Sequence, residues 1–292
     1  MEKNALAATT LQNRLDLFED CASAVDHLFK QALVHKQDNA FLDFLNFIRN
    51  FDRLSVYNAM LVQIQRPGAT AVGTRRRWAA IDRNVNPDAI PIIVLQPFGP
   101  VSFLYELGDT SGRPIRGQEH GPLKATGKVT AKQFKETKLT AQKLNVEVVD
   151  TNQYGLFLAG TAAAINQLPE RLAPSNQADA TYYYRVKLNA IHDDPTRFAT
   201  LAHELGHIYC GHLGAHPKGL WPARTSLSIQ HQELEAEAVA WLVCRRTGVQ
   251  PRSEEYLSAL MAGVDMQSVS MYAIFEAANR VEARTKIKKQ GR

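Results

Sequence analysis

The chain has 292 residues, of which 45% are hydrophobic and 22% are charged, and its formal net charge is +5. These values are ordinary for a soluble globular protein, and the length is sufficient for one large or two modest domains. The sequence contains no run of about 18 apolar residues, which excludes a membrane-spanning helix. Its start has neither an apolar core nor a small-residue cleavage site, so we expect no signal peptide.

The first part of the chain, residues 1–122, predicts a small mixed α/β domain. Apolar spacing indicates helices over 9–35 and 39–64, and a Pro-Gly pair ends the second helix. Residues 69–116 mix short β segments, PIIVLQPF and VSFLYEL, with Gly/Pro turns. The loop GQEHGPLKATG then predicts a linker to the next domain.

The second part, residues 123–292, predicts a larger domain with helices and a sheet. A helix is expected over 130–144, and strands are expected in the segments VEVVD, GLFLAG to AAAI, and YYYRVKLN. The last of these strands leads directly into a long helix. Either GLFLAG or YYYRVKLN could form the edge of the sheet, where an extended peptide binds by strand addition. The predicted fold class is therefore α+β.

The long helix carries the sequence HELGH at 203–207, which has the form H-E-x-x-H. Residues four apart share one face of a helix, so His203 and His207 can both reach one metal ion. Zinc takes such a pair of neutral imidazole nitrogens at about 2.0–2.1 Å and keeps room for a water. Glu204 stands beside that water as a general base. The motif therefore predicts a catalytic zinc site.

Signals at both ends support a helix around this motif. Asp194 is a good N-cap and Pro195 suits the first helical position. Gly211 is a suitable stop. Cys210, three residues after His207, could ligate a metal or could be a small buried core residue, and the core interpretation is favoured.

A second helix, over 232–240, offers the third ligand that a catalytic zinc site needs. Glu233 and Glu237 are four residues apart and share a face, whereas Glu235 points elsewhere. One of the two carboxylates on the shared face would ligate the metal. The other could accept the N–H of a ligand histidine and fix its tautomer. Glu235 is expected to be dispensable for metal binding.

The stretch LAHELGHIYCGH, followed by ELEAEAVAWLV, resembles the ImmA/IrrE family of metallopeptidases. That family has H-E-x-x-H and then a Glu-rich helix with the pattern E-x-E-A-[ND]-x-F-A. Glu237 stands where the family often has Asn or Asp, and Val239 where it often has Phe. The resemblance covers about 186–284 and implies a zincin-like, gluzincin-type metallopeptidase domain over 123–292. It also implies that Glu233 ligates Zn²⁺ and that Glu237 assists.

Two other regions resemble the antirestriction protein ArdC. They are EEYLSALMAG with MYAIFEAANRVEAR near the end of the chain, and SVYNAMLVQIQRPGATAVGTRRRWAAIDRNV near its start, with its Asn, its Gln and a later Trp. The resemblance implies an ArdC-like N-terminal domain over 1–122. Domains of that kind are associated with single-stranded DNA.

One basic cluster in the first part of the chain has two interpretations. Arg75, Arg76 and Arg77 stand next to Trp78. The arginines could hold a phosphate backbone while a base stacks on the indole ring. Equally, this could be a solvated arginine run beside a core tryptophan.

Three functions remain open at this stage. The first is a cytoplasmic zinc endopeptidase that cleaves a specific protein, such as a regulator. The second is an ArdC-like antirestriction protein that binds single-stranded DNA and carries a structural or secondary zinc site. The third is a toxin or defence protease that a partner triggers. An odd count of three cysteines without a pairing pattern favours the cytoplasm for all three. Candidates to stabilise the oxyanion of peptide hydrolysis are His212, His216, His231, Tyr209 and Tyr183.

Overall fold

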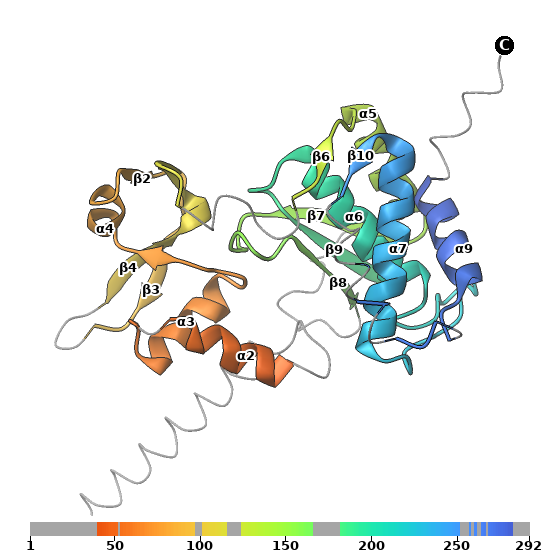
Figure 1. Cartoon of the computed structure of the whole chain (residues 1–292), viewed down its shortest axis with the longest axis horizontal. Coiled ribbons are helices and arrows are strands. Elements are labelled where there is room, and N and C mark those ends of the chain that lie inside the picture. Colours follow the sequence, from red (N-terminus) through yellow and green to blue (C-terminus); the bar gives the residue numbers. More distant parts are fainter. Residues whose placement is uncertain are drawn as a thin grey trace, which may run out of the picture.

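The computed structural model describes residues 40–51, 53–96, 101–115, 124–165, 182–251, 257, 260–261, 264–266 and 268–282. The fold is α+β, as the sequence predicts, and the chain forms two regions (Figure 1). One large hydrophobic cluster belongs to the C-terminal region and two smaller ones are centred in the N-terminal region. The predicted helix over 9–35 lies outside the described residues, as does Cys21. Within the described ranges, no helix combines the length and the apolar composition of a membrane span.

In its described residues, the N-terminal region combines three α-helices with five short strands. The helices are α2 (Ala40–Arg49), α3 (Val56–Gln65) and α4 (Arg75–Ala79). The strands are β1 (Val72–Gly73), β2 (Arg83–Val85), β3 (Ile92–Val94), β4 (Ser102–Glu106) and β5 (Thr110–Gly112), with a short 3-10 helix at Leu107–Asp109. They form one antiparallel sheet of order β1-β4-β3 and one pair, β2-β5.

The helix predicted over 39–64 is two helices instead of one. The chain leaves α2 at Arg49 and α3 begins after Ser55, whose side chain accepts a hydrogen bond from the Asn58 N–H at 3.3 Å. Serine at this position satisfies a backbone donor that has no partner inside the helix. The break lets both helices pack around one small core, which includes Phe51, Ala59 and Val62.

Two side-chain amides of α3 cover the open edge of β3. Asn58 donates to the Leu95 carbonyl and accepts from the Leu95 N–H, both at 2.9 Å. Gln65 makes the same pair of bonds with Ile93, at 2.8 and 2.9 Å. Each amide therefore takes the place of a residue in a neighbouring strand, and the edge is closed without one.

The C-terminal region is built on a three-stranded sheet of order β7-β9-β8. Its strands are β7 (Val146–Thr151), β8 (Gly160–Ala164) and β9 (Tyr184–Asn189). The central strand β9 pairs parallel with β7 and antiparallel with β8. The suggestion that YYYRVKLN forms the sheet edge is therefore wrong, because this strand is paired on both sides.

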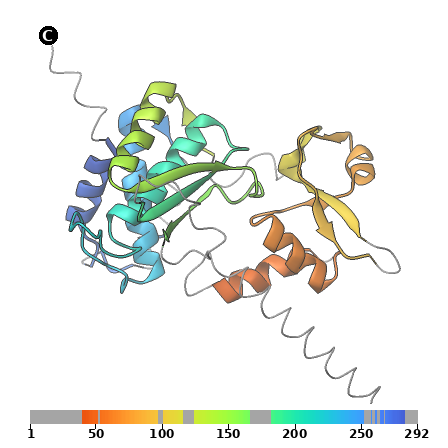
Figure 2. The same cartoon turned by 180° about the vertical axis from the view of Figure 1, so that it is seen from behind.

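Four helices are described in this region, together with a short pair formed by β6 (Thr126–Gly127) and β10 (Val249–Gln250). The helices are α5 (Ala131–Lys143), α6 (Asp194–Tyr209), α7 (Ile229–Thr247) and α9 (Met271–Glu282). Helix α6 packs on β8 and β9, and α7 and α9 pack on α6. Figures 1 and 2 show the sheet between this helical layer and the N-terminal region.

Helix α6 has strong signals at its start. Its N-cap is Asp193 rather than Asp194, because the Asp193 carboxylate accepts from the Thr196 N–H at 3.0 Å. Pro195 lies within the first turn, where its missing N–H costs nothing. Apolar residues of the helix, among them Phe198, Leu201 and Leu205, are buried in the main core.

The loop between β7 and β8 contacts the N-terminal region. The Gly155 N–H donates to the Pro67 carbonyl at 2.8 Å, and the Phe157 N–H donates to the Gly68 carbonyl at 3.2 Å. The guanidinium of the buried Arg66 donates to the Asn152 carbonyl in the same loop. Backbone contacts thus tie the N-terminal region to the segment that leads into strand β8.

Candidate metal centre

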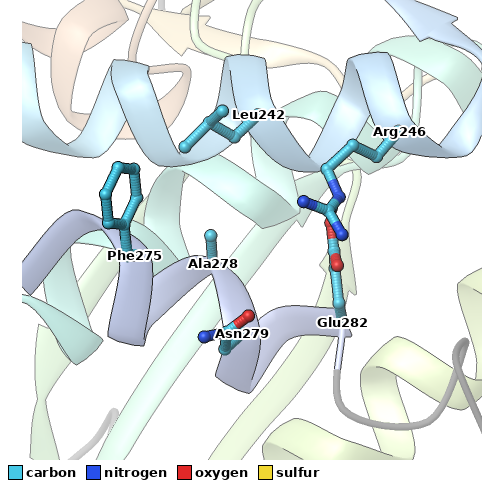
Figure 3. A pocket seen from close by; sticks show the side chains of 6 residues that line it. All are labelled: Leu242, Arg246, Phe275, Ala278, Asn279 and Glu282. Carbon is cyan, nitrogen blue, oxygen red and sulfur yellow. The ribbon is translucent and has the colours of Figure 1, made fainter.

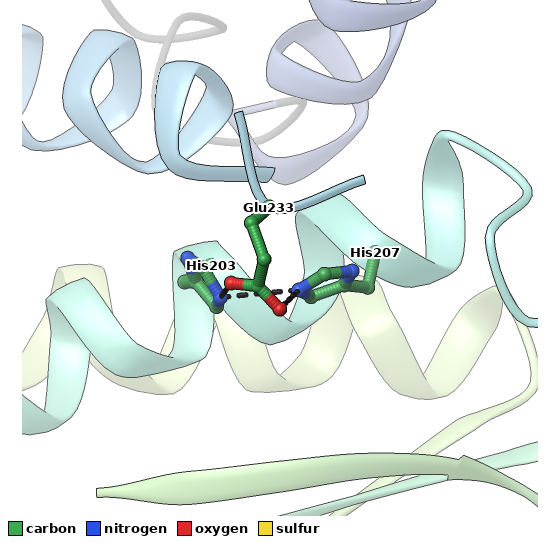
Figure 4. A group of neighbouring side chains, drawn as sticks. All are labelled: His203, His207 and Glu233. Atoms are coloured by element: carbon green, nitrogen blue, oxygen red, sulfur yellow. Dashed lines mark hydrogen bonds and ion pairs between the residues drawn. The ribbon is translucent and has the colours of Figure 1, made fainter. Parts of the chain in front are cut away.

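Two histidines of α6 and one glutamate of α7 converge on a single point (Figure 4). The Nε2 atoms of His203 and His207 lie 3.1 Å apart. Glu233 places one oxygen 3.5 Å from His203 Nε2 and the other 3.6 Å from His207 Nε2. Ligands held at about 2.0–2.1 Å around a tetrahedral zinc ion lie about 3.3 Å from one another. The separations of the three donors therefore fit a metal ion.

The close approach of α6 and α7 depends on a glycine in the motif itself. A Cβ on Gly206 would lie 3.0 Å from the Cα and 3.1 Å from the carbonyl oxygen of Ala236 on α7. The two backbones can approach this closely because neither residue carries a large side chain. This close crossing brings the start of α7, with Glu233, over the two histidines.

The protonation states of the three side chains depend on one another. Burial lowers the pKa of His207 to about 3, and the charge of His203 acts in the same direction. Burial opposes a charge on His203 as well, but its hydrogen bonds to Glu233 and Glu237 raise its pKa well above 6.5. Burial likewise opposes ionisation of Glu233, yet the hydrogen bond to His203 lowers its pKa to about 2. A metal cation would replace the proton of His203, since ligand histidines are neutral.

Glu204 lies where α6 approaches strand β8. A Cβ on Gly160 would lie 3.6 Å from Cγ of Glu204 and only 2.6 Å from Cγ2 of Thr200, so glycine permits the close approach. Burial raises the pKa of Glu204 to about 7, while the charge of His203 and the N–H of Ala162 lower it. A carboxylate that titrates near neutrality beside a metal centre is suited to accept and return a proton.

Each histidine of the centre has a partner at its other ring nitrogen. His203 Nδ1 lies 3.0 Å from an oxygen of Glu237, which is where the helical phase of α7 predicts this carboxylate. His207 Nδ1 lies 3.1 Å from Nδ1 of His212. His212 in turn places its Nε2 3.0 Å from an oxygen of Glu235.

Glu235 points away from Glu233, as the helical phase predicts, but it is not isolated from the centre. It is fully buried, and Arg224 donates to both of its oxygens, at 2.5 and 2.7 Å. The Ser270 N–H donates to it at 2.9 Å. Although burial opposes ionisation, the hydrogen bonds from His212 and Arg224 lower the pKa of Glu235 to about 2.

The turn that ends α6 places His212 against His207. Gly211 has φ of 80°, and the chain reverses there so that the His212 N–H donates to the His207 carbonyl at 3.0 Å. The Gly211 N–H donates to the Ile208 carbonyl at 3.1 Å, which completes a Schellman motif. The predicted stop at Gly211 is confirmed. The same signal, a glycine followed at once by a histidine, could have identified His212 as a neighbour of the centre.

The second cluster of metal-binding residue types, Cys210, His212 and Glu235, is an unsuitable cation site. The guanidinium of Arg224 already occupies both oxygens of Glu235. A cation beside it would meet a fixed positive charge. Cys210 is buried in the main core, where burial raises the pKa of its thiol to about 12.

The other predicted oxyanion candidates make their contacts with groups outside the three donors. His216, Tyr183 and Tyr209 belong to an aromatic cluster around Trp221, and His231 bonds Ser228 and Ser268. Tyr154, which the sequence did not single out, is buried in the loop before β8, and its hydroxyl lies 2.8 Å from the hydroxyl of Thr161. Burial raises its pKa to about 12, and the charge of Glu204 contributes.

The basic cluster divides in two. Arg75, Arg76 and Arg77 are exposed on α4. Trp78 is only 4% exposed, and its indole N–H donates to the Tyr105 carbonyl at 2.9 Å, so its ring is not available to stack on a base. The structure therefore shows a solvated arginine run beside a core tryptophan.

A pocket also lies between α7 and α9, away from the metal centre (Figure 3). Leu242, Phe275 and Ala278 give it an apolar wall, and an ion pair of 2.8 Å between Arg246 and Glu282 closes one side. It contains none of the three metal donors.

No family model matches the sequence, and no curated protein matches it. Among solved structures, the Mn(II)-bound antirestriction protein ArdC from the R388 plasmid aligns with a TM-score of 0.30 and 13% identity, over 77% of this chain and 80% of that one. The metal-free form of the same protein aligns with a TM-score of 0.31 and 17% identity, over 77% and 81%. At these values the comparisons assign neither a family nor an activity to this chain.

Proposed function

We propose that the protein is a zinc-dependent endopeptidase with a zincin-like C-terminal domain. The observation that carries the proposal is the convergence of His203, His207 and Glu233 at tetrahedral separations, with the carboxylate of Glu204 beside them. Three ligands with one open position are the arrangement of catalytic zinc sites, whereas structural zinc sites use four protein ligands.

Zinc bound at this centre would polarise a water and lower its pKa toward neutrality. Glu204 accepts the proton of that water and delivers it to the leaving nitrogen of the cleaved bond. It follows a ligand directly on α6, and its charge interactions with His203 and Glu233 indicate that its carboxylate lies close to the centre. Glu237 accepts from His203 Nδ1 and keeps the Nε2 lone pair of that ring directed at the metal.

Strand β8 is where the peptide substrate would bind. It lies at the edge of its sheet, and Gly160 brings it within van der Waals distance of Glu204. An extended peptide could pair with the backbone of such an edge and so lie near Glu204. Of the GLFLAG segment, only the last residue, Gly160, belongs to this edge strand, because β8 is Gly160–Ala164.

The proposal is tested by the Glu204→Gln variant of the full chain. This variant should bind zinc as the wild type does and should retain a cleavage target in a pull-down, while the wild type cleaves the same target. Cleavage by Glu204→Gln at the wild-type rate would overturn the role of Glu204. A wild-type protein that binds no zinc would overturn the centre.

A second candidate function is binding of single-stranded DNA through the N-terminal region. The observation that favours it is the exposed run Arg75 to Arg77 on α4, with the Arg75 guanidinium 4.6 Å from the ring of Tyr105. Contacts between arginine side chains and the phosphates of DNA weaken steeply as the salt concentration increases. A salt-dependent shift of single-stranded DNA that persists in Glu204→Gln supports this function, and no shift at low salt contradicts it.

A further inference from the structure

We propose that His212, Glu235 and Arg224 form a relay that orients His207 and fixes its tautomer, which makes them positioning residues of the metal centre. The inference rests on the proposed function, because it assigns a role toward the metal. It goes beyond it, because none of the three residues belongs to the H-E-x-x-H motif or to the ligand set.

The relay follows from the position of one hydrogen. His207 directs its Nε2 toward His203 and Glu233, so a metal there takes the Nε2 lone pair. The ring hydrogen must then be on Nδ1, which lies 3.1 Å from Nδ1 of His212. His212 accepts this hydrogen bond and therefore carries its own hydrogen on Nε2.

The hydrogen on His212 Nε2 is directed at Glu235, the acceptor that completes the relay. This nitrogen lies 3.0 Å from an oxygen of Glu235, and both side chains are fully buried. Both oxygens of Glu235 already accept hydrogen bonds from Arg224, so the carboxylate acts as an acceptor toward His212 and permits a single tautomer of it. That tautomer in turn permits a single tautomer of His207, the one with a free Nε2.

Arg224 holds the Glu235 carboxylate in place. It donates to both carboxylate oxygens, at 2.5 and 2.7 Å, and a further donor is the Ser270 N–H at 2.9 Å. These groups come from the loop after α6 and from the residue before α9, so two segments far apart in sequence hold one carboxylate. A fully satisfied buried network of this kind has one arrangement, and a partly satisfied one is costly.

The two ligand histidines are consequently held in different ways. His203 meets a carboxylate directly, through Glu237 at 3.0 Å. His207 lies in the last turn of α6, and the Schellman turn at Gly211 places His212 next to its Nδ1. The imidazole of His212 therefore stands between His207 and Glu235. Through it, Glu235 orients His207, whereas Glu237 contacts His203 directly.

The first test is zinc affinity, measured by chelator competition on the folded full chain. His212→Ala removes the acceptor for His207 and should weaken zinc binding by about 10–100-fold, the range for loss of a partner behind a ligand. His212→Asn restores an acceptor oxygen near the Nδ1 position and should recover affinity to within a few-fold of the wild type. Glu235→Gln replaces the carboxylate at the end of the relay with an amide. Its zinc affinity should lie between those of His212→Ala and His212→Asn.

The matched control is His216→Ala. His216 is also buried, at 2% exposed, and lies in the same loop, but it packs on Trp221 rather than on a ligand. It should leave zinc affinity unchanged even where it lowers stability. Equal losses in His212→Ala and His216→Ala would show general destabilisation and would overturn the relay.

The second test needs no variant. In the cobalt(II)-loaded wild-type protein, NMR resolves the shifted Nδ1 protons of the ligand histidines. The Nδ1 proton of His207 should exchange slowly with solvent, because the fully buried His212 accepts it. Rapid exchange of this proton would overturn the relay alone. A wild-type protein that binds neither zinc nor cobalt would overturn the proposed function and the relay together.

Discussion

The two regions of the molecule use some of their polar side chains for different purposes. Around α6 and α7, buried acids and histidines bond to one another, and the series from Arg224 through Glu235 and His212 ends at His207. In the N-terminal region, the amides of Asn58 and Gln65 bond to backbone instead and close the edge of β3. The first arrangement directs donors at one point. The second only completes a sheet, so chemistry is expected in the C-terminal region and support or binding in the N-terminal one.

Loss of Glu204 should produce the largest effect on peptide hydrolysis. It would show that the chemistry belongs to the C-terminal region. Glu204→Gln should lower peptide hydrolysis by about 10²–10⁴-fold, the usual contribution of a general base, and leave zinc content unchanged. Hydrolysis is measured on a captured target with zinc-loaded protein. The matched control is Glu276→Gln, which alters an exposed glutamate paired with Arg280 on α9 and should be neutral. Equal loss in both variants would contradict the assignment.

The three glutamates of α7 should differ in their effect on zinc. Glu233→Ala removes a ligand and should weaken binding most. Glu237→Ala removes the acceptor behind the ligand His203 and should weaken zinc binding by about 10–100-fold. Glu235→Ala removes the acceptor behind His212, which contacts the ligand His207, so it should also weaken zinc binding. Helical phase alone predicts that Glu235→Ala resembles the wild type. Chelator competition on all three variants shows whether Glu235→Ala binds zinc more weakly than the wild type, as the relay predicts, or as tightly as the wild type, as helical phase alone predicts.

The close crossing of α6 and α7 can be opened by a single side chain. Gly206→Val places methyl groups against the Ala236 backbone, which lies 3.0 Å from the Cβ position. Overpacking of this kind costs about 1–3 kcal/mol of stability, and the displaced helix should carry Glu233 away from the histidines. Thermal unfolding and zinc titration should both change. A stable variant with wild-type zinc affinity would show that the crossing does not set the site.

The amide bonds at β3 should matter for the N-terminal region alone. Asn58→Ala and Gln65→Ala should each cost about 0.5–1.5 kcal/mol, the net worth of a hydrogen bond, and leave zinc affinity intact. Faster hydrogen exchange at the Leu95 and Ile93 amides is the direct readout. Altered zinc binding in either variant would contradict the expectation that these amide bonds affect the N-terminal region alone.

The smallest effect on stability should come from the arginine run. Replacing Arg75, Arg76 and Arg77 with alanine should change stability by less than about 0.5 kcal/mol each, as for other exposed positions. If the region binds single-stranded DNA, the slope of log affinity against log salt should fall by about 0.7 for each phosphate that an arginine no longer neutralises. An unchanged slope in the triple variant would remove these arginines from any DNA interface.

What could be predicted from the sequence follows from the range of each interaction. Spacing within one helix is rigid, so His203 and His207 on α6, and Glu233 and Glu237 on α7, are found on the faces that periodicity predicts. Caps are local as well, although the N-cap of α6 is Asp193 and not its neighbour.

Features that depend on the packing of distant segments could not be predicted. Nothing in the local pattern shows that Arg224 and Ser270 would meet at Glu235, because these contacts join separate parts of the chain. Strand order is equally non-local, and alternation alone could not show that Tyr184–Asn189 lies in the middle of its sheet. The burial of Trp78 likewise depends on Tyr105 in a later strand.

The metal content of purified protein tests the central claim most directly. Elemental analysis of the wild type should find close to one zinc per chain, and His207→Ala should lose most of it, because one of three ligands that converge at tetrahedral separations is gone. Full retention of zinc by His207→Ala would contradict the account.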